Sequence, residues 1–153
     1  MSKRISCRAI VIADGGLVTM YREKEGRVYY TFPGGGMEGT ETEEDCVKRE
    51  VMEEFGLTVK PIKKLYTYEN QNSVEHFYLA EWVAGEFGTG EGEEYQPDRN
   101  NGVYIPKFIE ISQIPNLPLM PPEVATAFYN DYVENGEKVG TNEKVVSIYS
   151  NTD

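Results

Sequence analysis

The sequence predicts an α/β fold in which a mixed β-sheet is packed between helices. Three observations support this class. Strand-like runs lie on both sides of one central helical segment, a second helical segment comes late, and 153 residues suffice for one domain with a sizeable core. We therefore expect residues 1–153 to form a single domain.

The expected strands are apolar runs bounded by turn residues. The first, Ile5–Asp14, ends at Gly15 and Gly16 and leads into Leu17–Tyr21, which predicts a hairpin. Pro33 ends the third expected strand. Pro106 lies within a later expected strand and predicts an edge strand or a bulge there. The remaining strands are expected at Val28–Phe32, Leu65–Tyr68, Val74–Ala84, Val103–Glu110 and Lys144–Tyr149.

The central helix is expected from Glu43 to Phe55. Thr42 is a good N-cap, Asp45 can complete a capping box, and Gly56 suits the position after the helix, where φ is positive. An apolar stripe recurs every four residues at Val47, Val51 and Phe55, with Cys46 beside it. A second helix is expected from Glu123 to Glu134, ended by Asn135-Gly136.

The charge balance restricts the partners. The formal net charge is −11, from 15 basic and 26 acidic residues, so the surface repels nucleic acid polymers and anionic membranes. A phosphorylated ligand is then tolerated only beside something positive, such as a bound metal ion. Cys7 and Cys46 form no C-x-x-C pattern, which argues against a disulfide scaffold or a zinc site. The N-terminal apolar run is too short for a signal peptide or a membrane span, so we expect a cytoplasmic protein.

Three carboxylates share one face of the expected central helix. Glu50, Glu53 and Glu54 stand at i, i+3 and i+4, and the apolar stripe lies on another face, so we expect them to point away from the core. Such carboxylates repel one another unless a cation lies between them, and hard oxygen ligands favour Mg²⁺, Mn²⁺ or Ca²⁺. The alternative is a solvated helix face, held by the pairs Glu44 with Lys48 and Asp45 with Arg49.

The spacing of these residues resembles the signature of the Nudix hydrolases. That signature has a glycine, five residues, a glutamate, seven residues, and then R-E-U-x-E-E-x-G-U, where U is aliphatic. Each specified position is matched, by Gly35, Glu41, Arg49, Glu50, Val51, Glu53, Glu54, Gly56 and Leu57. One departure is Gly39-Thr40 before Glu41, where relatives more often place the glycine directly before the glutamate.

The resemblance implies a Nudix hydrolase domain over residues 1–153, with an α/β/α sandwich and a mixed β-sheet. It implies hydrolysis of a small-molecule nucleotide, a nucleoside diphosphate linked to another moiety, with Mg²⁺ or Mn²⁺. Glu53 and Glu54 are then metal ligands, Glu50 is a ligand or helps to activate water, and the Gly35 carbonyl adds a ligand. Glu41 and Arg49 are implied as a supporting pair that orients the site.

Two other functions stay open at this point, a non-catalytic nucleotide-binding module and a purely structural acidic protein. The complete set of glutamates favours the enzyme, because sensor forms tend to lose one or more of them. The sequence does not identify the substrate or the oligomeric state, for which a homodimer is one option.

Residues outside the motif have weaker signals. The acidic loop residues Glu91, Glu93 and Glu94 are either solvated or the source of a further metal ligand or general base. His76 is alone and is expected to be structural. Four aromatic residues in strands are expected in the core, with base stacking as the alternative; they are Tyr66, Tyr68, Phe77 and Tyr78.

Overall fold

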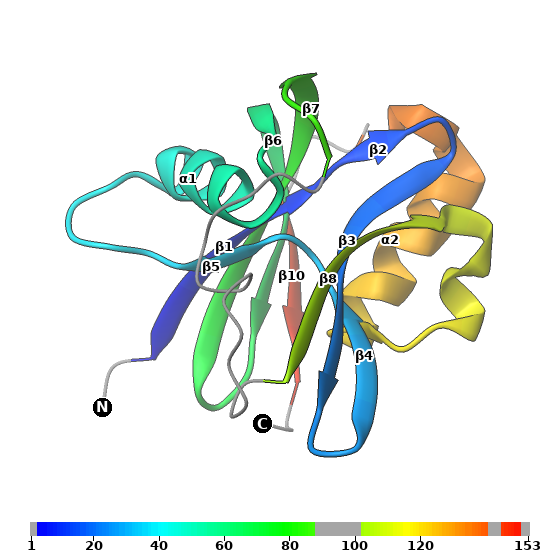
Figure 1. The fold of residues 1–153 in the computed structure, drawn as a ribbon, viewed down its shortest axis with the longest axis horizontal. Helices are drawn as coiled ribbons and strands as arrows, with labels where there is room; N and C mark the ends of the chain where they lie inside the picture. The colour runs from blue at the N-terminus through cyan, green and yellow to red at the C-terminus, as the bar shows by residue number, and fades with distance from the viewer. Residues whose placement is uncertain (1–2, 88–101, 141–144, 151–153) are drawn as a thin grey trace.

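Two β-sheets and two main helices make up the fold in a computed structural model, which describes residues 3–87, 102–140 and 145–150 (Figure 1). The α/β class is confirmed. In chain order the elements are β1 (Arg4–Ile10), β2 (Ile12–Ala13), β3 (Gly16–Lys24), β4 (Arg27–Thr31), β5 (Gly34–Gly36), α1 (Glu43–Phe55), β6 (Thr58–Glu69), β7 (Ser73–Ala84), β8 (Val103–Glu110), η2 (Ile111–Asn116), β9 (Leu119–Met120), α2 (Pro122–Asn135), η3 (Gly136–Lys138) and β10 (Val146–Tyr149).

The first sheet is mixed, as the sequence predicts. Its order is β10-β6-β7-β1-β5. Strand β1 runs parallel to β7 and antiparallel to β5, and β6 and β7 form an antiparallel hairpin. The second sheet has the order β2-β3-β4-β9, with β8 paired to β3. Among the described strands β8 has β3 as its one partner, so Pro106 lies on an edge strand, one of the two options that the sequence left open.

The sequence-based expectation of one long first strand, Ile5–Asp14, is wrong. The chain pairs with β7 only as far as Ile10, and Ile12–Ala13 then pairs with β3 in the second sheet. A tight hairpin turn pairs Ile12–Ala13 with the start of β3, which belongs to the second sheet. Asp14 and Gly15 both have positive φ, 51° and 74°, which gives a two-residue turn whose twist matches that of paired strands.

Helix α1 has the predicted bounds because its caps are local signals. The Thr42 hydroxyl accepts a hydrogen bond from the Asp45 amide at 3.1 Å, and Gly56 has a φ of 72° and donates to the Met52 carbonyl at 2.9 Å. An N-cap of this kind contributes about 1 kcal/mol to stability. Helix α2 begins at Pro122, where the missing amide hydrogen costs nothing, with Glu123 in its first turn.

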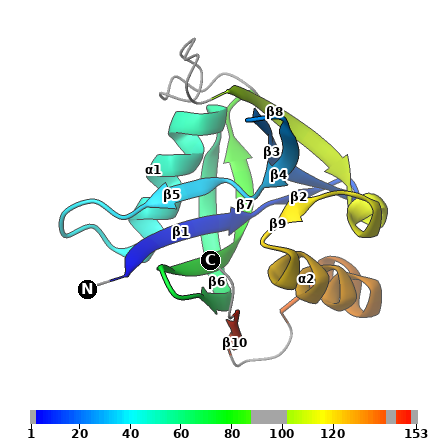
Figure 2. The ribbon, with the colours of Figure 1, turned by 90° about the horizontal axis from the view of Figure 1, so that it is seen from below.

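The two helices lie on opposite sides of the strands, each over its own hydrophobic cluster (Figure 2). Strand β1 contributes to both clusters because its side chains alternate. Cys7 and Ala9 pack with Val47, Val51 and Phe55 of α1, whereas Ile10 packs on the α2 side. These apolar positions of α1 are fully buried, as its periodicity predicts. No helix in the described part of the chain is long and apolar enough to span a membrane.

Candidate active site

At Gly34 and Gly35 the glycine strand β5 approaches its neighbours so closely that a side chain would clash with them. A Cβ atom on Gly34, whose φ is 145°, would lie 2.7 Å from the Arg8 Cα atom. A Cβ atom on Gly35 would lie 2.7 Å from the carboxylate carbon of Glu50. Real Cβ atoms do not come this close to other atoms. The glycines therefore leave a space beneath α1 that the Glu50 carboxylate fills.

This space corrects the expectation that the three glutamates point away from the core. Glu50 and Glu54 are buried, with 9% and 7% of their surface exposed, whereas the Glu53 side chain is 46% exposed. The Gly34 amide donates a hydrogen bond to Glu54 Oε1 at 2.8 Å. A carboxylate in this position is thus held by backbone of the glycine strand, which the helical spacing alone does not reveal.

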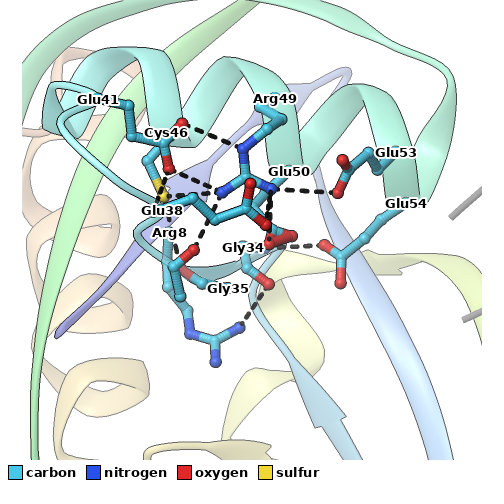
Figure 3. Close-up of polar contacts among 11 residues, drawn as sticks. Arg8, Gly34, Gly35, Glu38, Glu41, Cys46, Arg49, Glu50, Glu53 and Glu54 are labelled. Atoms are coloured by element: carbon cyan, nitrogen blue, oxygen red, sulfur yellow. Dashed lines mark hydrogen bonds and ion pairs between the residues drawn. The ribbon is translucent and has the colours of Figure 1, made fainter. Parts of the chain in front are cut away.

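Arg49 lies at the centre of the acidic cluster (Figure 3). Its Nε donates to Glu41 Oε2 at 3.1 Å and its Nη2 donates to Glu41 Oε1 at 2.8 Å, a bidentate contact. Its Nη1 lies 3.4 Å from Glu50 Oε1, 3.2 Å from Glu53 Oε1 and 3.6 Å from Glu38 Oε2. Glu50 and Glu53 therefore have a cation between them, as their repulsion requires, and in the structure this cation is the Arg49 guanidinium. The pairing of Arg49 with Asp45 is wrong, since Asp45 lies 4.0 Å from Lys48 instead.

The Glu41–Arg49 pair is held in place from both sides. The hydrogen bonds from Arg49 lower the pKa of Glu41 to about 2, and the Glu38 amide adds a further bond at 2.8 Å. Arg49 Nη2 also donates to the Gly36 carbonyl at 3.0 Å. Arg49 thus connects the helix, the loop before it and the glycine strand.

The donor set suits a hard divalent cation. Glu50, Glu53, Glu54 and the Gly35 carbonyl offer only oxygen atoms, which are the ligands that Mg²⁺ and Mn²⁺ prefer. The glycine strand leaves the space that the Glu50 carboxylate occupies, since any side chain on Gly35 would fill it. Within residues 3–87, 102–140 and 145–150, no three Asp, Glu, His or Cys side chains are placed so that together they could hold a metal ion. In this arrangement Glu50 and Glu53 are paired with the Arg49 guanidinium.

Arg8 is a site residue that the sequence-based reasoning missed. It directly precedes the apolar run that begins at Ala9, and its Nε donates to Glu75 Oε1 at 2.6 Å. Its Nη1 donates to the Phe32 carbonyl at 2.9 Å and to the Gly34 carbonyl at 3.3 Å. Burial lowers the pKa of Arg8, but the field of Glu75, Glu54 and Glu50 outweighs it and keeps the guanidinium charged. A basic residue directly beside the buried apolar run of β1 was the available signal.

A second polar cluster anchors the first turn of α1 to the first sheet. Glu43 accepts a hydrogen bond from the Tyr78 hydroxyl at 2.6 Å and lies 2.8 Å from Lys64 Nζ and 3.5 Å from His76 Nε2. His76 is therefore in a structural environment, as expected, and desolvation lowers its pKa. Cys46 is buried in the core, and its thiol donates to the Gly35 carbonyl at 3.6 Å.

The other sequence candidates divide into two groups. The four aromatic residues proposed as core or as a stacking platform are all buried, which favours the core; they are Tyr66, Tyr68, Phe77 and Tyr78. The loop residues Glu91, Glu93 and Glu94 lie outside the described residues. Their contribution to the site stays a prediction.

Comparison with known proteins assigns the family. A family model described as NUDIX domain matches residues 3–126. No curated protein matched the sequence.

Similar solved structures agree with this fold. A NUDIX hydrolase from Nitrosomonas europaea aligns with a TM-score of 0.71 at 15% identity, covering 98% of this chain and 81% of that one. An ADP-ribose pyrophosphatase from Streptococcus suis aligns at 0.62 and 17% identity, covering 97% and 100%. A MutT NUDIX hydrolase from Burkholderia pseudomallei aligns at 0.65 and 22% identity, covering 83% and 98%. At these identities the likeness concerns the fold alone.

Proposed function

The chain belongs to the Nudix hydrolase family, and on that premise we propose that it is a metal-dependent pyrophosphohydrolase. Its substrate would be a nucleoside diphosphate linked to another moiety, such as a nucleoside triphosphate or a related nucleotide derivative. The observation that carries this proposal is the burial of Glu50 and Glu54 against the glycine strand, with Arg49 between the carboxylates. A merely solvated acidic helix would not bury two glutamates.

Each residue of the cluster has a proposed role. Glu53, Glu54 and the Gly35 carbonyl would hold Mg²⁺ or Mn²⁺, and Glu50 would bind metal or accept a proton from the attacking water. A divalent ion there would supply positive charge against the pyrophosphate oxygens. Glu41 would hold Arg49 in orientation, and Arg49 would keep Glu50 and Glu53 in place.

The acidic surroundings also support a metal-bridged substrate. Six glutamates share two guanidinium groups, so the site as described is negatively charged. Arg49 lies beside four of them, Arg8 is paired with Glu75, and Glu54 accepts from the Gly34 amide; the four beside Arg49 are Glu38, Glu41, Glu50 and Glu53. A pyrophosphate would be repelled there without a divalent cation. Similar structures include an ADP-ribose pyrophosphatase and a UDP-X diphosphatase, and we propose the same bond type for this chain.

A coupled phosphate-release screen tests the proposal. The panel would contain nucleoside triphosphates, ADP-ribose and nucleotide sugars, each with Mg²⁺ or Mn²⁺. With the nucleoside triphosphates, inorganic pyrophosphatase reveals released pyrophosphate. With ADP-ribose and nucleotide sugars, alkaline phosphatase reveals newly exposed monophosphates. We expect Glu54→Gln to abolish turnover without unfolding the protein, because glutamine still offers an oxygen to the Gly34 amide. Glu44→Gln is the matched control, since Glu44 is exposed on the same helix.

The outcomes separate the candidate functions. Metal-dependent turnover that Glu54→Gln removes and Glu44→Gln keeps supports the enzyme. Saturable nucleotide binding without turnover on any substrate would support the non-catalytic module instead. A cytoplasmic location and a homodimer stay predictions, which fractionation and sedimentation would check.

A further inference from the structure

Arg8 and Glu75 form an ion pair on a largely apolar face of the first sheet. Arg8 Nε donates to Glu75 Oε1 at 2.6 Å, from β1 to the adjacent parallel strand β7. The same face carries Ile10 and Phe77 of the hydrophobic cluster on the α2 side, and the two charged side chains are only 22% and 16% exposed. Desolvation makes such a pair costly, and apolar side chains in its place are often equally stabilising or more so. Stability alone is therefore a weak reason for this pair.

Arg8 holds the chain where it enters the glycine strand. Its Nη1 donates to the Phe32 carbonyl at 2.9 Å and to the Gly34 carbonyl at 3.3 Å. The carbonyl between them, that of Pro33, accepts from the Ala9 amide of β1 at 2.8 Å. Three successive carbonyls are thus bound to β1, two of them by the Arg8 side chain.

The glycine strand needs such a hold because it has no side chains of its own to fix it. Gly34 has a φ of 145°, which other residues rarely adopt, and a Cβ atom there would lie 2.7 Å from the Arg8 Cα atom. Strand β5 also lies at the end of the sheet order, so among the described strands β1 is its one partner. The conformation of this backbone is therefore set by the hydrogen bonds of its polar groups.

Gly34 connects this hold to the carboxylate cluster. Its carbonyl accepts from Arg8, its amide donates to Glu54 Oε1 at 2.8 Å, and Figure 3 shows both contacts. Because a hydrogen bond requires a nearly linear N–H···O arrangement, the direction of this amide determines where the Glu54 carboxylate lies. Groups that orient a metal ligand in this way typically cost about 10- to 100-fold in metal affinity or activity when they are removed.

We propose that Arg8 and Glu75 are positioning residues for the Glu54 carboxylate. Glu75 orients the Arg8 guanidinium, Arg8 holds the carbonyls on either side of Pro33, and the Gly34 amide held in this way donates to Glu54. No contact of Arg8 or Glu75 with metal or substrate is needed for this role. The expected effect on turnover rests on the proposed function, whereas the effect on Gly34 can be measured without metal or substrate.

An apolar replacement of the whole pair separates positioning from stability. Arg8→Met combined with Glu75→Leu removes both charges, so we expect a melting temperature close to or above that of the wild type. Lys3→Met combined with Glu69→Leu is the matched control. That pair has the same 2.6 Å N–O distance and is more exposed, and in the described part of the chain neither of its side chains hydrogen-bonds to the glycine strand.

Three measurements report on positioning. Hydrogen exchange of the Gly34 amide in the metal-free protein should be at least about tenfold faster in the Arg8, Glu75 double variant, while the Val51 amide in α1 keeps its rate. Mn²⁺ binding to the substrate-free protein, followed by electron paramagnetic resonance of the free ion, should weaken about tenfold. With saturating metal, kcat should fall about tenfold and KM for the nucleotide should stay within about threefold. A pair with only a structural role would change none of these in a variant that melts normally.

If the double variant does not fold, Arg8→Lys takes its place, because lysine keeps the charge but cannot bind Glu75 and two carbonyls at once. Three results would overturn the inference: unchanged Gly34 exchange in a folded variant, an equal acceleration in the Lys3, Glu69 control, or faster exchange with wild-type kcat and Mn²⁺ affinity.

Failure of this inference is distinct from failure of the proposed function. A chain that hydrolyses nucleotides equally well after the pair is replaced loses the positioning role alone. A chain whose Gly34 exchange and Mn²⁺ affinity respond as expected, but which hydrolyses nothing, keeps the positioning role and loses the reaction.

Discussion

Gly35→Ala is expected to disable the site while leaving the fold nearly intact. The added Cβ atom would lie 2.7 Å from the Glu50 carboxylate carbon and nearer still to Oε1, whereas ordinary contacts begin at 3.4 Å, so the carboxylate must retreat by about 1 Å. Retreat is cheap in stability because the clash is with the end of a side chain. We estimate about 1 kcal/mol, at the low end for overpacking, or a melting temperature lower by about 2–4 °C.

The cost to catalysis should be larger than the cost to stability. A misplacement of about 1 Å can cost roughly a hundredfold, so we expect kcat to fall roughly 10- to 100-fold. The rate would be measured with saturating substrate and Mg²⁺, and unfolding by circular dichroism. Gly36→Ala is the matched control, since its Cβ atom would meet only the Arg4 guanidinium, at ordinary contact distances of 3.4 Å and more.

A double-mutant cycle tests whether Gly35 acts through Glu50. If it does, Gly35→Ala should cost little further in a Glu50→Gln background. Two results would refute the reasoning: a Gly35→Ala enzyme within about threefold of the wild-type rate, or a Gly36→Ala enzyme that loses as much.

The remaining predictions concern charge. Arg49→Lys should lower activity because lysine cannot reproduce the bidentate contact with Glu41. Unchanged kinetics would show that this contact is not needed for catalysis. Mg²⁺ should stabilise the protein by RT ln(1 + L/Kd), where L is the free metal concentration. This is roughly 2.7 kcal/mol at a hundredfold excess over Kd, or a melting-temperature rise of very roughly 5–10 °C. The rise should shrink in the Glu53→Gln, Glu54→Gln double variant, and an equal response to sodium chloride at matched ionic strength would contradict a specific site. Burial lowers the pKa of His76, so the unfolded chain takes up a proton more readily than the folded one. Stability should therefore fall as the pH drops through about 6.5. Urea unfolding at pH 7.5 and 5.5 should show this loss, and His76→Gln should diminish it.

The sequence was sufficient for elements whose signals are local. Helix α1 runs from Glu43 to Phe55 as predicted because Thr42 and Gly56 cap it, and β8 covers the predicted Val103–Glu110. The pairing of strands was not predictable in this way. Ile10 and Ile12 belong to different sheets. Ile10 pairs with the distant Leu79, whereas Ile12 pairs with the nearby Leu17, and the local sequence does not show which residues pair.

The same contrast holds for the candidate site. Motif spacing indicated which helix residues lie together, and Glu41 does contact Arg49. The burial of Glu50 could not be read from the helix, because it depends on the space that a separate glycine strand leaves. Arg8 was missed for a related reason. Its relevance comes from Glu75, which is adjacent to it only across the pairing of β1 with β7.

The pairing of β1 with β7 and of β3 with β8 also determines when the chain can fold during synthesis. Strand β1 needs residues as far as Leu79, and β3 needs residues as far as Glu110, before each has its full partner. At translation rates of about 5–20 residues per second, synthesis of the chain between β3 and the end of β8 takes roughly 5–20 s. Helix α1 can form within microseconds of leaving the ribosome, but it has no completed sheet to dock on. The nascent chain therefore exposes its apolar strands for seconds, and a fragment that ends before β8 should aggregate rather than fold.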